Sequence, residues 1–151
     1  MVSAVIAAIL WLAPQVGPAD ARLYGEVIRQ EAERWDVDPL LVVAVIHRES
    51  RWDPRARSRT NDWGLMQVHV SRTTYSGFLD HPERLFNPRL NIRLGIRLMA
   101  IWKGYHAGHC RPGSHPFWAH FKYGKRIPRK REGRRVDTLY QELLARFRPE
   151  V

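Results

Sequence analysis

The chain has 151 residues, which suits one domain built around one hydrophobic core, and its formal net charge is +10. Hydrophobic residues make up 44% and charged residues 26% of the sequence, a balance that excludes wholesale disorder, and no apolar run reaches the length of a membrane-spanning helix. The positive charge indicates an anionic partner, such as nucleic acid, a membrane surface or a polyanionic envelope, without choosing among them.

Residues 1–21 have the order of a secretory signal. The run from Val2 to Ala13 is apolar except for one serine, a stretch with two prolines and a glycine follows, and 19–21 is a small-x-small cleavage site. No Lys or Arg precedes the apolar run. We expect a signal peptide over 1–21, export to the periplasm or the cell exterior, and a mature chain that begins at Arg22. The alternatives are a packed N-terminal helix and an uncleaved anchor, which would be short for a span.

The first half of the mature chain predicts two helices and a loop. Residues 22–35 look amphipathic. Asp38-Pro39 is a helix start, with an N-cap residue and a proline at the first helical position. The helix that follows is apolar on all sides as far as Ile46 and reaches Ser50, so we expect it to be buried. Residues 53–63 are predicted as a loop, and 64–68 as a short extended piece or a turn.

The second half begins with another clear helix start at Asn87-Pro88, and the apolar spacing continues to about Trp102. The remaining elements are predicted in this order: a loop rich in Gly, His and Pro over 103–116, a short helix over 117–121, a basic irregular stretch over 122–135, and a last helix from Asp137 to Phe147. No segment gives a convincing run of alternating strand residues. The fold class is therefore mainly α, in a single domain over 22–151 with a basic C-terminal extension from about 122.

Glu49 is the candidate general acid. It shares a helix face with three apolar residues, Val42, Val45 and Ile46. A carboxyl with apolar neighbours is harder to ionise, which is what a general acid needs near neutral pH. On helix geometry alone, the alternative is a solvated glutamate at a helix end that pairs with Arg48 or Arg51.

Three patterns stand in a fixed order along the chain: Glu49-Ser50, then Gly64-Leu65-Met66-Gln67, then Asn87-Pro88-Arg89-Leu90-Asn91-Ile92-Arg93-Leu94-Gly95. Over about residues 25–126 the chain resembles the catalytic domain of the SLT-type lytic transglycosylases, a lysozyme-like family. The resemblance implies a lysozyme-like domain with helices packed around a buried central helix that carries the catalytic glutamate. It also implies peptidoglycan glycan strands as the partner, a monomer, and no cofactor or metal.

By that resemblance, Glu49 protonates the bridging oxygen between N-acetylmuramic acid and N-acetylglucosamine. It then acts as base on the muramic 6-hydroxyl, which closes a 1,6-anhydro ring instead of admitting water. One carboxylate can suffice because the N-acetyl group of the sugar can assist at the anomeric carbon. Four residues are implied to bind substrate or to position the glutamate: Ser50, Gly64, Met66 and Gln67. Asn91 and Gly95 are expected to fix the helix behind the site.

The chain departs from the last motif of the family, which is usually Tyr-Asn-x-Gly. The matching stretch is His120-Phe121-Lys122-Tyr123-Gly124. The phenol that would bond the glutamate is absent if Phe121 takes its position, although Tyr123 could replace it from two residues on. Phe121 and Tyr123 are therefore candidate substrate-binding residues, and a weak or inactive enzyme stays open.

Two further hypotheses compete with this one. Asp53 or Asp62 could activate water as the second carboxylate of a goose-type lysozyme, although both positions are more typical of turns. A catalytically weak glycan-binding module, or a basic nucleic-acid-binding module, is the alternative from another class. It would use the basic run Lys122, Lys125, Arg126, Arg129, Lys130, Arg131, Arg134 and Arg135. Only Tyr123 offers stacking within this run, so we expect no nucleic acid there and favour anionic peptide stems or envelope polymers, with a solvated loop equally compatible.

Residues of metal-ligand type gather between the second clear helix and the short one: His106, His109, Cys110 and His115. Their spacing fits no structural zinc pattern, so we expect a solvated loop and no metal. Cys110 is the only cysteine, which excludes an internal disulfide.

Overall fold

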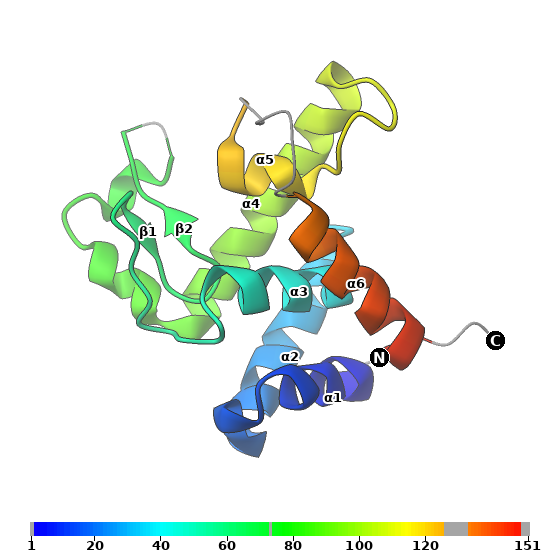
Figure 1. The fold of residues 1–151 in the computed structure, drawn as a ribbon. Coiled ribbons are helices and arrows are strands. Elements are labelled where there is room, and N and C mark those ends of the chain that lie inside the picture. Colours follow the sequence, from blue (N-terminus) through cyan, green and yellow to red (C-terminus); the bar gives the residue numbers. More distant parts are fainter. Residues whose placement is uncertain (1, 73, 126–132, 149–151) are drawn as a thin grey trace.

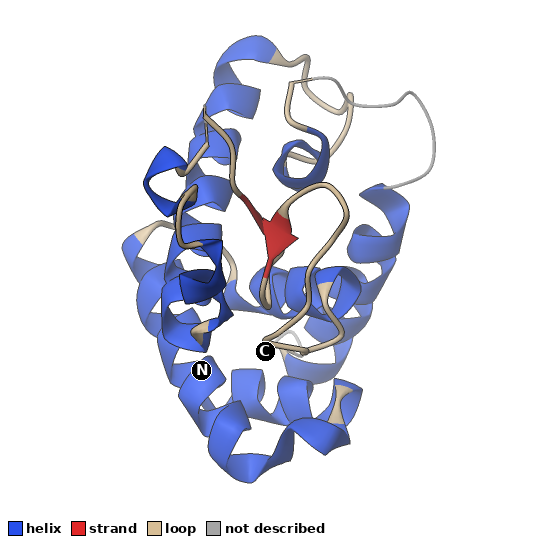
Figure 2. Cartoon of the chain, turned by 90° about the vertical axis from the view of Figure 1, so that its left-hand side faces the viewer, coloured by secondary structure: helices blue, strands red, loops and turns tan. Residues whose placement is uncertain are grey.

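The computed structural model describes residues 2–72, 74–125 and 133–148. The α-helices within these residues are α1 (Val2–Leu12), α2 (Gly17–Arg34), α3 (Pro39–Glu49), α4 (Pro88–His109), α5 (Trp118–Tyr123) and α6 (Gly133–Phe147). Short 3-10 helices cover Pro14–Val16, Ser76–Phe78 and Pro82–Phe86, and one hairpin joins β1 (Asp62–Trp63) to β2 (Val68–His69). Figure 2 shows this small hairpin framed by helices and loops. The mainly α prediction is confirmed.

The central element is α3, with α2, α6 and α1 packed against it (Figure 1). Its residues from Pro39 to Ile46 are all buried, as the apolar pattern predicts. The helix begins where expected, because the Asp38 carboxylate accepts a hydrogen bond of 2.9 Å from the Leu40 N–H and Pro39 needs no partner for its nitrogen. Glu49, the last residue of α3, is thereby placed where the buried helix emerges.

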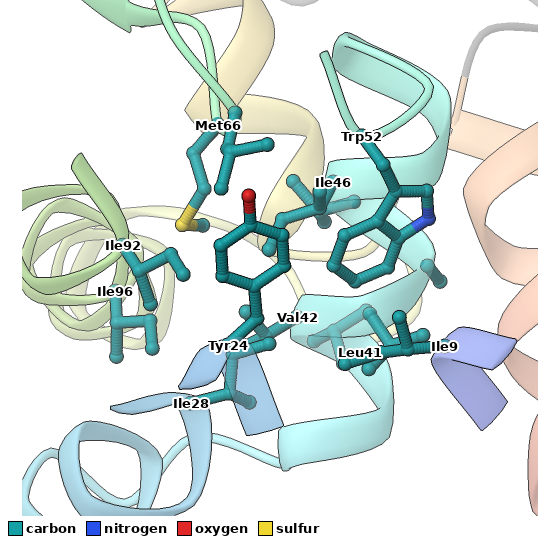
Figure 3. Close-up of a cluster of buried hydrophobic side chains, with 14 of the residues drawn as sticks. Ile9, Tyr24, Ile28, Leu41, Val42, Ile46, Trp52, Met66, Ile92 and Ile96 are labelled. Carbon is teal, nitrogen blue, oxygen red and sulfur yellow. The ribbon is translucent and has the colours of Figure 1, made fainter. Parts of the chain in front are cut away.

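The core extends from α3 to α2 and α4. Tyr24 of α2 stacks on Trp52, with ring centroids 6.1 Å apart. Figure 3 shows the Tyr24 ring between Trp52 on one side and Ile92 of α4 on the other, with Met66 above it. These side chains belong to one continuous cluster of buried residues. Segments far apart in the chain therefore share a single core, as one domain requires.

The N-terminal helix α1 belongs to the same core. Val5, Ala8 and Ile9 have no exposed surface, and the chain turns after them into α2. Ala21, the last residue before the predicted cleavage point, is buried within α2. Processing after Ala21 would therefore divide α2, and the signal peptide stays a prediction.

None of the described helices is by itself long and apolar enough to cross a membrane. The segments Ser3–Leu12 and Pro14–Arg34 meet the length and composition criteria only as a pair, with a bend of 105° between them.

Several predicted boundaries were wrong. The helix α4 continues to His109, so 103–109 is helix and not loop. Gly104 and Gly108 cost about 1 kcal/mol each in a helix, but Trp102 and Tyr105 pack against His120 of α5 and offset that cost. At the other ends, α2 begins five residues before the predicted start, α5 runs to Tyr123, and α6 begins at Gly133, ahead of Asp137.

Asp38 also ties the C-terminal helix to α3. The Tyr140 hydroxyl donates to Asp38 Oδ2 at 3.0 Å, and Arg148 Nη1 donates to the same oxygen at 2.8 Å. Burial, followed by the charge and the hydrogen bond of Asp38, raises the pKa of Tyr140 to about 12. One carboxylate therefore caps the central helix and anchors α6 on it.

We predict that Asp38→Ala lowers the free energy of unfolding by about 1–3 kcal/mol, because both the cap and the anchor of α6 are lost. Urea denaturation measures this change. Asp80→Ala, at an exposed position outside the helices, is the control and should stay within about 0.5 kcal/mol of the parent. Equal stability of the two variants would show that Asp38 does not link α3 to α6.

Candidate active site

Glu49 lines a polar pocket of about 630 Å³ and keeps 15% of its side chain exposed. The other described residues that line this pocket are His47, Arg48, Arg51, Lys122, Arg135 and Val136. Among these described lining residues, Glu49 is the only acidic one. The pocket brings together the end of α3, the turn after it, α5 and the start of α6, which are far apart in the sequence.

The pocket is strongly cationic. Lys122 Nζ lies 3.9 Å from Glu49 Oε1, while the predicted apolar stripe of Val42, Val45 and Ile46 is buried, as expected. Burial, followed by the charges of the nearby Arg48 and Arg51, lowers the pKa of His47, so that this imidazole is neutral at neutral pH. The pocket is suited to a ligand that carries carboxylates.

The turn after Glu49 is held by Ser50. Its hydroxyl donates to the Ile46 carbonyl at 3.3 Å and accepts from the Trp52 N–H at 3.1 Å. Arg51 and Trp52 both have positive φ, at 53° and 68°. Ser50 therefore shapes the backbone that ends α3, and its predicted role in positioning Glu49 stays a prediction.

The Gly64–Gln67 turn connects β1 to β2 and is clamped by Asn91 of α4. The fully buried Asn91 side chain accepts from the Met66 N–H at 2.8 Å and donates to the carbonyls of Trp63 at 2.7 Å and Leu85 at 2.9 Å. An unpaired backbone group in this place would cost about 1–3 kcal/mol. The structural role expected for Asn91 is confirmed, and it explains why the second and third patterns occur together.

Two glycines allow the close packing of this turn. Gly64 has a φ of +73°, and a Cβ there would overlap the Asn91 side chain and the Leu85 carbonyl. On α4, a Cβ at Gly95 would overlap the Met66 side chain. Met66 itself is fully buried. Any part that Gly64 and Met66 play in substrate binding therefore acts through the position of the turn.

Gln67 uses its amide within the same loop. Nε2 donates to the Gly64 carbonyl at 2.9 Å and to the Ala56 carbonyl at 3.2 Å. Gln67 is not among the described residues that line the Glu49 pocket. Contact of Gln67 with Glu49 or with substrate stays a prediction.

The two aromatic candidates lie on α5, and Lys122 lies between them. Phe121 is half-buried against the core. The Tyr123 hydroxyl is buried and has no hydrogen-bond partner among the described residues. Lys122 extends towards Glu49, with its Nζ 3.9 Å from Glu49 Oε1. Sequence reasoning placed Lys122 only in the basic run, although its position beside Phe121 in the last motif was a signal.

The carboxylates proposed as a second catalytic group are engaged elsewhere. Asp62 Oδ2 accepts from the hydroxyls of Ser58 and Thr60, each at 2.5 Å, and Oδ1 lies 2.8 Å from His69 Nδ1. Asp53 accepts from the Arg55 N–H at 2.8 Å. Asp62 therefore stabilises the hairpin, and Asp53 forms a turn.

The basic run is only partly described. Arg126, Arg129, Lys130 and Arg131 lie outside the described residues, as does the side chain of Arg134. Lys122 and Arg135 line the Glu49 pocket, and Lys125 Nζ lies 5.7 Å from the centre of the Tyr105 ring. Sequence reasoning gave no local signal for Arg135, because the packing of α6 on α3 brings it to the pocket.

The expected solvated loop of histidines is wrong. Because α4 continues to His109, Cys110 directly follows the helix, one turn after His106, and both converge with His115 on His120 of α5. His109 stands apart and stacks on Tyr105, with centroids 4.3 Å apart. Burial, followed by the neighbouring imidazoles, lowers the pKa values of His106 and His115. His120 was overlooked because it fell in the last motif of the resemblance.

A helical domain with a glutamate at the end of a buried central helix, and a hairpin turn clamped by an asparagine of a second helix, is a domain of the lysozyme-like class. Residues 26–111 match the transglycosylase SLT domain family, and the chain belongs to this family. The resemblance that the sequence patterns indicate is confirmed.

The chain is similar to several curated proteins named membrane-bound lytic murein transglycosylase C. It is 38% identical over 89 residues to the protein of Actinobacillus pleuropneumoniae serotype 5b, covering 54% of this chain and 24% of the relative. It is 34% identical over 95 residues to the protein of Edwardsiella ictaluri, covering 58% of this chain and 26% of the relative. It is 33% identical over 107 residues to the protein of Yersinia enterocolitica, covering 66% of this chain and 30% of the relative. The chain therefore spans less than a third of the length of these relatives.

Two glycines of α4 provide a matched pair for testing the packing of the turn. We predict that Gly95→Ala lowers the free energy of unfolding by about 1–3 kcal/mol, because the new methyl group displaces Met66. The new Cβ of Gly104→Ala has no atom within 4 Å, so this variant should raise the free energy of unfolding by about 0.5–1 kcal/mol. Chemical denaturation of both variants is the measurement. If Gly95→Ala is as stable as Gly104→Ala, Met66 does not pack on α4 as described.

Proposed function

We propose that the chain cleaves the β-1,4 bond between N-acetylmuramic acid and N-acetylglucosamine in peptidoglycan, without hydrolysis, and that Glu49 is the catalytic acid and base. One observation carries the proposal: Glu49 emerges from the buried α3 into a pocket whose other described lining residues include no carboxylate. Membership of the SLT family supports it, as do relatives named lytic murein transglycosylases.

The chemistry proceeds in two steps. Glu49 donates its proton to the bridging oxygen, and the bond from this oxygen to the muramic anomeric carbon breaks while the N-acetyl oxygen of the same sugar bonds to that carbon. The Glu49 carboxylate then takes the proton of the 6-hydroxyl, and the 6-oxygen displaces the N-acetyl oxygen. The product is a 1,6-anhydromuramic end, and Glu49 regains the proton that it donated.

The hydrogen bonds that Asp62 and Asp53 make elsewhere support this non-hydrolytic reaction over hydrolysis. A goose-type hydrolase would need a second carboxylate that can take a proton from water. Asp62 Oδ2 accepts from Ser58 and Thr60 and its Oδ1 lies beside His69 of β2, while Asp53 caps a turn. The hydrolase is the second candidate, and product analysis separates the two.

The cations of the pocket support peptidoglycan over a neutral glycan. Lys122 and Arg135 can attract the carboxylates of peptide stems, which neutral glycans lack. Anionic envelope polymers share this chemistry. We propose a location in the bacterial envelope, in agreement with the predicted export and with relatives named membrane-bound lytic murein transglycosylases.

The first functional test is Glu49→Gln. The amide keeps the shape of the side chain but cannot deliver a proton, so turnover of purified murein should fall by at least about 10²–10⁴-fold while the thermal midpoint is retained. Glu26→Gln, at an exposed position on α2, is the matched control and should retain parental activity. Parental turnover by a folded Glu49→Gln variant would refute the assignment.

Mass spectrometry of the released muropeptides decides between the two reactions. We expect anhydromuropeptides from the parent. Reducing-end products that disappear in a folded Asp62→Asn variant would establish the hydrolase instead. A parent inactive on every murein tested, with activity gained by Phe121→Tyr, would assign the defect to the missing phenol.

Arg135 tests the contribution of the positive pocket. Arg135→Gln should raise KM for murein with peptide stems by roughly two- to fivefold, because one exposed ion pair contributes at most about 1 kcal/mol. The effect should shrink at high salt and on glycan strands stripped of their stems. Arg89→Gln, at an exposed position on α4, is the control. An equal rise in KM on stripped strands would contradict recognition of the stems by Arg135.

A further inference from the structure

Four side chains at the end of α4 and the start of α5 bring metal-binding atoms together. One donor atom from each of His106, Cys110, His115 and His120 lies within 4.8 Å of the other three. His120 is at the centre and is 2% exposed. Its Nε2 lies 3.1 Å from His115 Nε2, 3.4 Å from His106 Nδ1 and 3.4 Å from Cys110 Sγ.

Hydrogen bonds within the cluster cannot account for this convergence. His120 Nδ1 lies 2.7 Å from the Gly124 carbonyl, which only accepts, so Nδ1 carries the proton and Nε2 presents its lone pair. This single lone pair can accept one good hydrogen bond, yet three possible partner atoms surround it: His106 Nδ1, Cys110 Sγ and His115 Nε2. The contact with Gly124 is also the type of second interaction that orients a metal-binding histidine. Gly124 has a positive φ of 61°, and the Trp102 ring stacks on His120 with centroids 5.4 Å apart.

We propose that His106, Cys110, His115 and His120 bind one zinc ion. Zinc prefers four nitrogen and sulfur ligands in a tetrahedron, and its usual bond lengths place ligand atoms about 3.3–3.6 Å from one another. The three distances from His120 Nε2 come close to these values. The widest separation in the set, 4.8 Å, closes with side-chain movements of about 1 Å. Binding converts the Cys110 thiol to a thiolate and releases one proton to solvent.

The site is structural, because four protein ligands leave no open position for a substrate. It would join the last turn of α4 to α5 across the loop that carries His115. Lys122, two residues after His120 on α5, lies close to Glu49. Zinc would therefore set the position of α5 beside the pocket. Its binding can be measured without murein, so its failure is distinct from a failure of the proposed function.

The experiment uses the full chain, purified through a tag that contains no histidine. Metal analysis of the purified protein and competition with a chromogenic zinc chelator give stoichiometry and affinity. Cobalt replaces zinc in a second measurement, because tetrahedral cobalt has intense visible bands and a thiolate adds a charge-transfer band. Cys110→Ser and His115→Gln test two ligands that are only partly buried, which limits the risk of misfolding. His109→Gln is the matched control, one residue from Cys110 but outside the cluster.

We expect one zinc per chain, a zinc-dependent rise in thermal midpoint, and tetrahedral cobalt bands with a thiolate contribution. Loss of an outer partner of a metal ligand typically weakens binding by 10–100-fold, so loss of a ligand should weaken it by at least about 100-fold. His109→Gln should bind like the parent, and the charge-transfer band should be absent from Cys110→Ser. Zinc affinity unchanged in Cys110→Ser and His115→Gln, or no stoichiometric zinc in the folded parent, would overturn the proposal.

Discussion

A helix that is apolar on every side must be surrounded by other protein, and this constraint on α3 organises the molecule. From Pro39 to Ile46 no residue can face water, so α1, α2 and α6 pack against the helix. The first N–H groups of a buried helix cannot bond to water and need partners within the protein. The Asp38 carboxylate provides one by accepting the Leu40 N–H. The first ionisable side chains appear only where the packing ends. Glu49 therefore stands at the boundary between the apolar core and a cationic pocket.

The long helix α4 connects the remaining parts. In its first half, Asn91 and Gly95 hold the hairpin turn through buried hydrogen bonds and close contact with Met66. At its C-terminal end, His106 and the C-cap residue Cys110 lie close to His120 of α5. Both ends of one rigid element thus position segments on which the pocket region depends. A rigid helix holds two such segments in a fixed position relative to each other more precisely than a loop would.

The starts of α3 and α4, the burial of α3 and the structural roles of Asn91 and Gly95 could be predicted, because each rests on local capping, spacing or a motif. The features that could not be predicted depend on contacts between distant segments. Gly104 and Gly108 suggested a loop, since sequence alone does not show that aromatic packing on α5 offsets their cost. The predicted loop hid the fact that His106 and Cys110, four residues apart, are brought to the same side by a helical turn. Arg135 enters the pocket only through the packing of α6.

The turn after Glu49 stores conformational strain. Arg51 and Trp52 are consecutive non-glycine residues with left-handed backbone, a conformation that costs on the order of 1–3 kcal/mol per residue. The compensation comes from Trp52, which is buried and stacked on Tyr24 of α2. If that stacking is lost, the backbone gains by relaxing towards ordinary angles, and the relaxation begins two residues from the carboxylate. Tyr24 of α2 therefore helps to hold the backbone that follows Glu49, through its stacking on Trp52.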